Sequence, residues 1–127
     1  MPGKHLFEYA VIRVVPRVER EEFINVGVVL FCKQQRYLQT RFQVNKERLL
    51  ALCPALDIEE VQAYLTAFEK ITGGSADGGP IAKLDPPSRF RWLTATRSTV
   101  VQASKIHPGM CEDLDKALEK LFAQFVL

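Results

Sequence analysis

The chain has 127 residues, of which 47% are hydrophobic and 25% are charged, and its formal net charge is +2. This length suits one domain over residues 1–127, whose core needs neither a disulfide nor a metal. No apolar run reaches the roughly 20 residues of a membrane span, and residues 1–6 lack the apolar core of a secretion signal, so we expect a cytoplasmic protein with no membrane partner.

Three β-strands are predicted in the first third of the chain. The first covers residues 7–15 and ends at Pro16, which cannot donate a ladder hydrogen bond. The second covers residues 23–32, a largely β-branched run that suits a strand buried on both faces. The third covers residues 37–42, where apolar and polar side chains alternate. We expect an antiparallel meander.

Asn25 and Gly27 interrupt the apolar second strand, where both residue types normally weaken pairing. They indicate a β-bulge, a close approach of another backbone or ligand, or the wall of a site. We therefore predict that Gly27 cannot be replaced by a β-branched residue without loss of folding or binding.

The remaining elements follow from capping residues and apolar spacing. Asn45 predicts a helix over residues 46–52, and Asp57 with an acidic residue three positions later predicts a helix over 57–72. Residues 73–88 are rich in Gly and Pro and predict a loop. The last three elements are expected as strands at 89–95 and 98–104 and a final amphipathic helix at 111–126.

Together these elements predict an α+β fold, with a mainly antiparallel sheet of about five strands and three helices packed largely on one face. Such packing would leave one face of the apolar central strand without cover. Because large exposed apolar patches are unusual on monomers, we expect a homodimer or a stable complex with a protein partner.

A candidate polar site lies at the first hairpin. If the hairpin closes around residues 17–20, Arg13 falls opposite a residue between 22 and 25, within reach of a carboxylate or amide. Such a cluster can bind an anionic substrate of an enzyme, or it can neutralise a buried arginine and fix the register of the hairpin. The chain offers no G-x-S-x-G elbow, and we assign no catalytic residue. The candidate polar residues are Arg13, Arg20, Glu22, Asn25 and Gly27.

A second candidate site depends on arginines that alternate with aromatic residues, a pattern typical of proteins that bind single-stranded nucleic acid. Segments 1–56 and 83–107 are net basic, which would give the sheet a basic face. The alternative is a pair of core aromatics backed by a solvated basic face. The candidate nucleic-acid contacts are Arg36, Arg41, Arg89, Arg91 and Arg97.

Metal binding is not favoured. His107 and Cys111 are four residues apart, and Cys32 or Cys53 could complete a zinc site. However, Pro108 and Gly109 indicate a loop that enters a helix. We expect no metal, no cofactor and three reduced thiols.

Residues from both halves of the chain carry a family resemblance: Arg13, Pro16, Arg20, Glu22-Phe23 and Asn25 to Phe31, followed by Phe90 to Trp92, Ser104 and Leu121-Phe122. Through these residues the chain resembles the bacterial family of the domain of unknown function 3037 over nearly its whole length. The family pattern often has an acid after the proline, where this chain has Arg17.

The resemblance implies a small bacterial α+β protein without an assigned activity. Some members of the family are encoded beside kinases that resemble the HipA toxin class. The sequence thus favours a non-catalytic protein-interaction or accessory module of a bacterial cytoplasmic system, with a HipA-like kinase as a partner. A nucleic-acid-binding domain and an enzyme for an anionic substrate stand as alternatives.

Overall fold

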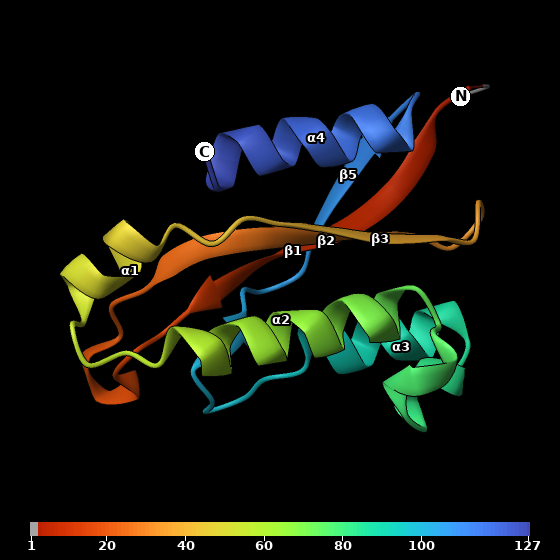
Figure 1. Cartoon of the computed structure of the whole chain (residues 1–127). Helices are drawn as coiled ribbons and strands as arrows, with labels where there is room; N and C mark the ends of the chain where they lie inside the picture. Colours follow the sequence, from red (N-terminus) through yellow and green to blue (C-terminus); the bar gives the residue numbers. More distant parts are fainter. Residues whose placement is uncertain (1–2) are drawn as a thin grey trace.

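Figure 1 shows an antiparallel sheet between two layers of helices in the computed structural model of the chain, which describes residues 3–127. The strand order is β3-β2-β1-β4, and β5 pairs with β1 next to β4. The strands are β1 (His5–Val14), β2 (Ile24–Cys32), β3 (Tyr37–Phe42), β4 (Val101–Ala103) and β5 (His107–Cys111), and the α-helices are α1 (Lys46–Leu52), α2 (Ile58–Thr72), α3 (Pro86–Thr94) and α4 (Leu114–Phe125).

The predicted meander is confirmed, because β1 pairs with β2 and β2 with β3, all antiparallel. A β-bulge interrupts the first pairing. Ile12 lies opposite Gly27 and Arg13 lies opposite Asn25, so Val26 has no partner on β1. The bulge shifts the alternation of side chains by one position, which changes the face to which the start of β2 contributes.

Both faces of the sheet are covered by helices (Figure 1). α2 and α3 pack on one face, here the α2/α3 face, over a core that includes Ile12, Val29 and Phe90. α4 packs on the opposite α4 face, against Val28 and Leu30. The α+β class and the five antiparallel strands were predicted correctly. The prediction of three helices largely on one face was wrong, since the described residues form four α-helices on two faces.

With helices on both faces, the central strand has no bare apolar face that would call for a homodimer. The expected dimer depended on a central strand with one bare face, and α4 supplies cover there from the same chain. The three amphipathic helices do not form a single layer because the strand is apolar on both faces, so burial of both requires helices on opposite sides.

Each α-helix begins at an Asn or Asp whose side chain accepts a backbone N–H of the first turn. Asn45 caps α1 and Asp57 caps α2, as predicted, through the N–H groups of Arg48 and Glu60. Asp85 caps α3 and Asp113 caps α4 in the same way. These local signals position the helices against the sheet.

The strand predicted at residues 89–95 is wrong, because this segment belongs to α3. Asp85 is the N-cap, and two prolines at the first helical positions suit a helix start. Phe90 and Leu93, three residues apart, are both buried. Residues 73–88 are also not a structureless loop, since they contain two short 3-10 helices and the first turn of α3.

The C-terminal prediction also needs correction. Of the strand expected at 98–104, only Val101–Ala103 is a strand, and the segment expected to lead into the final helix forms β5. α4 therefore begins at Leu114 and not at residue 111. Among residues 3–127, no helix has the length and apolarity needed to cross a membrane.

Candidate interaction surface

The Arg13 side chain does not form the predicted pair with Glu22 or Asn25. Its guanidinium lies 3.9 Å from the centroid of the Phe23 ring, and its buried Nε has no hydrogen-bond partner. Burial lowers the pKa of the Arg13 guanidinium. The register places Arg13 opposite Asn25, as predicted, but the two side chains do not pair. Asn25 instead donates to the end of α4, and the Arg13 cation lies over the aromatic face of Phe23.

We expect Arg13→Ala to lower the free energy of unfolding by about 1 kcal/mol, because the main loss is a half-exposed cation–π contact. Removal of one partner of a buried ion pair would lower the free energy of unfolding several times more. Urea unfolding of this variant beside Phe23→Leu, which removes the other partner, measures the contact. A loss above about 3 kcal/mol for Arg13→Ala alone would contradict the assignment.

The other residues of the candidate polar site are separated by the fold. Asn25 donates through Nδ2 to the carbonyl of Phe125, 3.1 Å away, and so caps the C-terminal end of α4. Arg20 and Glu22 pair with each other at 2.5 Å on the exposed hairpin loop. They line a cleft of about 280 Å³ together with Arg17 and Cys53. The cleft is distinct from the surroundings of Arg13, so the five predicted residues do not form one site.

Gly27 has a packing role on the α2/α3 face. It lies opposite Phe42 of β3, and a Cβ at this position would lie 2.1 Å from Cδ1 of the Phe42 ring and 2.8 Å from the carbonyl oxygen of Arg41. The predicted bulge and close approach are both present in this stretch. The glycine gives room to a neighbouring ring.

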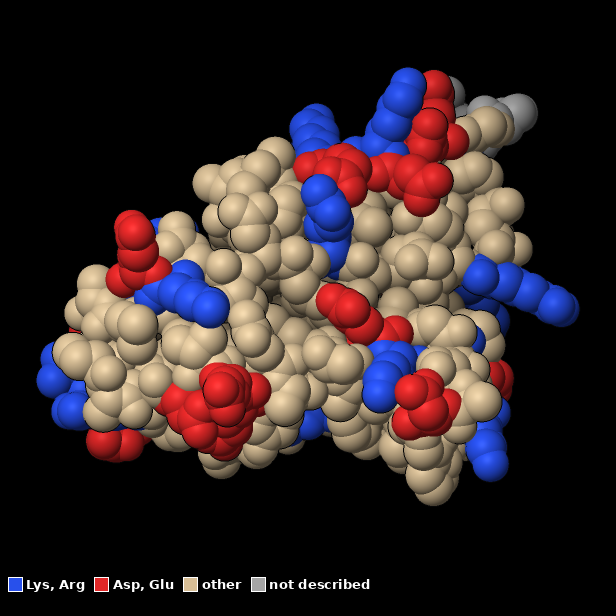
Figure 2. All heavy atoms as spheres, in the orientation of Figure 1, with Lys and Arg blue, Asp and Glu red and all other residues tan. Residues whose placement is uncertain are grey.

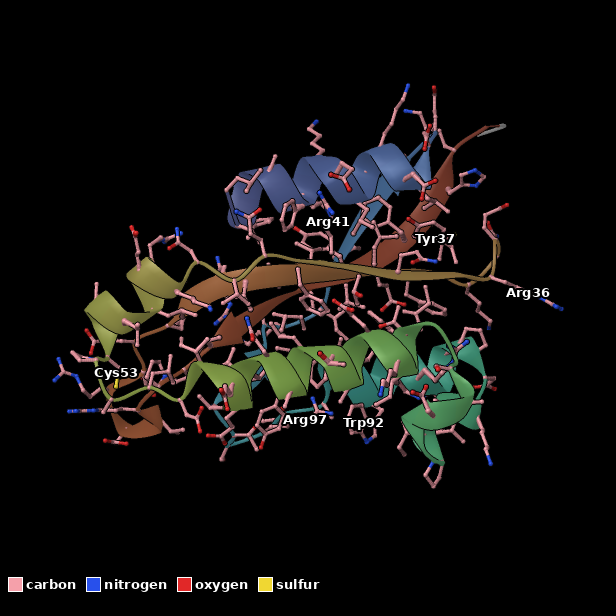
Figure 3. The ribbon with its side chains drawn as sticks, in the orientation of Figure 1. Arg36, Tyr37, Arg41, Cys53, Trp92 and Arg97 are labelled. Atoms are coloured by element: carbon pink, nitrogen blue, oxygen red, sulfur yellow. The ribbon has the colours of Figure 1, made fainter. Side chains whose placement is uncertain are left out.

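The five arginines considered for nucleic-acid binding do not share one surface. Arg36 extends from the hairpin between β2 and β3, whereas Arg41 lies between β3 and α4 (Figure 3). Arg41 pairs with Glu119 at 3.1 Å and lies over the Phe122 ring. Figure 2 shows acidic and basic side chains intermixed over α4, without a broad basic area on that face.

The three arginines near α3 are placed differently from the predicted strand. Arg89 donates through Nη1 to the carbonyls of Ile71 and Thr72 and so satisfies the end of α2. Arg97 donates to the last carbonyls of α3 and stacks on Trp92 (Figure 3). Arg91 is exposed and reaches only Ser88. Two of the three, Arg89 and Arg97, therefore hydrogen-bond to the C-terminal ends of helices within this chain.

Tyr37 of β3 forms a hydrogen bond that links the sheet to α4. Its hydroxyl donates to Oδ1 of Asp115 at 2.7 Å. Burial, the hydrogen bond to Asp115 and the negative charge of Asp115 all raise the pKa of the Tyr37 phenol from 10.0. One helical turn further along α4, the pair of Arg41 and Glu119 repeats the contact.

The raised pKa of Tyr37 predicts alkaline sensitivity. The folded state keeps the phenol protonated where the unfolded chain ionises it, so the folded state binds more protons and the free energy of unfolding falls as the pH rises above about 10. We expect Tyr37→Phe to be less stable than the parent at pH 7 and to lose less stability between pH 9 and pH 11. The free energy of unfolding is measured by denaturant titration at each pH. If it falls with pH at the same slope in the two proteins, the assignment is contradicted.

The three thiols are free, and the described residues contain no group of three His, Cys, Asp or Glu side chains suited to hold a metal. Cys32 and Cys111 lie on either side of β1, and Cys53 ends α1. His107 lies beside the Tyr9 ring, with the ring centroids 5.4 Å apart. It therefore sits within a strand and not in the predicted loop.

The paired ends of β1 and β5, residues 5–9 and 107–111, are here called the β1–β5 wing. On its α2/α3 face Leu6 and Met110 are register partners and are 61% and 59% exposed. A pocket of about 460 Å³ beside Leu6 is also lined by Phe31 and Pro108. In Figure 1 the N-terminal part of β1 rises away from α2 and α3. Two large apolar residues thus lie side by side on an open surface.

Sequence reasoning missed this surface. The predicted first strand begins only at residue 7, Pro108 and Gly109 indicate the entry of a helix, and the pairing of β1 with β5 joins opposite ends of the chain. The alternation of His107, Gly109 and Cys111 with Pro108 and Met110 is too short and irregular to predict a strand. The surface exists only in the folded chain.

The family model described as "Protein of unknown function (DUF3037)" matches residues 9–126. No curated protein and no solved structure matches the chain. The family match covers most of the hairpin, both helical layers and the β5 strand of the wing, whereas residues 5–8 of the wing lie outside it.

Proposed function

This chain belongs to the DUF3037 family of proteins of unknown function, and from that premise we propose that it is a non-catalytic protein-interaction module of a bacterial cytoplasmic system. The proposed docking surface is the β1–β5 wing. The observation that carries the proposal is the exposure of Leu6 and Met110 as neighbours on paired strands. Such residues contribute little to folding and are suited to burial against a partner.

The arrangement of the polar residues supports binding over catalysis. Arg20 is neutralised by Glu22, Arg13 stacks on Phe23, and Asn25 donates to the end of α4. Each of these candidate side chains has a partner within the chain. A catalytic pair would require a nucleophile or base held against a reacting group in a shared pocket.

The proposed partner is a HipA-like kinase, which the genomic association of the family suggests. Isothermal titration of the kinase into this chain should give saturable binding, and Leu6→Ser/Met110→Ser should weaken it by at least about tenfold. Leu84→Ser, at an exposed apolar residue away from the wing, is the matched control and should bind like the parent.

Because Leu6 and Met110 are exposed, the double variant should unfold at the same temperature as the parent. Binding that is unaffected by the double variant would refute the wing as the docking surface. The absence of any heat of binding, with the kinase active in autophosphorylation, would refute the kinase as the partner.

A further inference from the structure

We propose that the groove between α4 and the β1–β5 wing binds an amphipathic helix with an acidic flank, supplied by the partner protein. This inference rests on the proposed function and names the chemistry of the partner. The groove lies on the α4 face of the wing, on the opposite side of the sheet from Leu6.

The α4 face is short of one helix. Neighbouring strands are about 4.8 Å apart and packed helices are about 10 Å apart, so one helix covers about two strands. Two helices, α2 and α3, share the opposite face, whereas α4 alone packs on this one and contacts β2 and β3. The ends of β1 and β5 therefore lack the second helix that the geometry of the sheet accommodates.

The groove has an apolar floor and an apolar wall. Phe7 of β1 and Cys111 of β5 form the floor, and Ala117 and Leu121 of α4 form the wall, in a volume of about 570 Å³. Three of these four residues are only partly buried. Tyr9, whose ring lies 6.2 Å from that of Phe125, extends the apolar surface toward the end of α4.

The two flanks of α4 carry opposite charges. The flank toward β3 presents Asp115 and Glu119, whose carboxylates are engaged by Tyr37 and Arg41. The flank that lines the groove presents Lys116 and Lys120, and neither forms an ion pair within residues 3–127.

Glu112 and Asp113 lie at the β5 end of the groove, and Asp113 is engaged as the N-cap of α4. Carboxylates of the bound helix would therefore lie over the two lysines, away from this end of the groove. α4 has 12 residues and a length of about 18 Å, which sets the length of a parallel neighbour at about three turns.

A second copy of this chain does not fit the groove as well. The apolar faces of α2, α3 and α4 are all used in the core of the chain, and the acids on the β3 flank of α4 are engaged. An acidic amphipathic helix from another protein satisfies both the apolar floor and the free lysines. Light scattering over a dilution series tests whether a second copy occupies the groove instead. A homodimer that forms with the parent but not with Leu121→Lys would overturn the proposal.

The charge of the groove provides the sharpest test. The probe is a labelled, stapled helical peptide of about 14 residues, with Leu on one face and Glu along one flank, measured by fluorescence anisotropy. The parent should bind it saturably, and Lys116→Glu/Lys120→Glu should weaken binding by about tenfold or more. A second peptide with Lys in place of Glu should bind the reversed variant better than the parent.

The matched control is Lys46→Glu/Lys83→Glu, which changes the net charge equally at two exposed lysines away from the groove. The proposal is overturned if the acidic peptide does not bind the parent, or if the control weakens binding as much as the groove variant. Kinase binding that responds to Leu6→Ser, which lies outside the groove, but not to the groove variant would refute this inference alone. Peptide binding without kinase binding would refute the proposed partner alone.

Discussion

Gly27→Val should lower the free energy of unfolding by about 3 kcal/mol or more, the upper range for an overpacked site. The new side chain must occupy space held by the Phe42 ring and the Arg41 carbonyl, at 2.1 Å and 2.8 Å from a Cβ. The ring can turn, but the carbonyl belongs to the backbone of a paired strand. The change must therefore separate β2 from β3 or displace Phe42 from its packing.

Two comparisons isolate this cause in urea unfolding. Gly73→Ala, at the end of α2, places a Cβ 3.5 Å from its nearest contact and should change stability little. The double variant Gly27→Ala/Phe42→Ala should lose less free energy of unfolding than the two single variants lose together, because removal of the ring gives room for the methyl group. Gly27→Val with the parent melting temperature would show that the contact has no structural cost.

Arg97→Ala should lower the free energy of unfolding by about 2 to 4 kcal/mol. The Arg97 guanidinium donates to the carbonyls of Trp92 and Leu93, and it lies 4.3 Å from the Trp92 centroid and 5.3 Å from the Phe68 centroid. Its removal leaves carbonyls at the end of α3 without a donor and opens the contact between α2 and α3. Partial burial also lowers the pKa of this guanidinium, because removal from water disfavours the charged form.

Arg91→Ala is the matched control, because Arg91 is exposed and reaches only Ser88. It should unfold close to the parent. If Arg97 instead bound nucleic acid, Arg97→Ala would leave stability unchanged and would weaken a salt-dependent interaction with an oligonucleotide. Equal stability of the two alanine variants would contradict the structural role of Arg97.

The parts of the fold that sequence could predict are those with local signals. β-branched runs and alternation gave the meander, and the caps Asn45 and Asp57 gave α1 and α2. α3 was missed because Arg89 to Trp92 alternates with period two, like a strand, whereas the helical signal lies upstream in Asp85 and the prolines after it.

The candidate site was less predictable, because it depends on contacts between distant segments. Asn25 was identified as special, but its partner is the end of α4, which no local pattern indicates. The face chosen by α4 is likewise absent from its amphipathic repeat, since the same apolar stripe fits either side of the sheet. The exposure of Leu6 and Met110 follows from that choice together with the pairing of β1 and β5.

The most direct test of the β1–β5 wing as the docking surface is amide hydrogen exchange of this chain with and without a HipA-like kinase. We predict new protection in residues 5–9 and 107–111 and along the groove flank of α4, with exchange in α2 and α3 unchanged. Protection confined to α2, α3 or the hairpin loop, with the wing exchanging as in the free chain, would contradict the account.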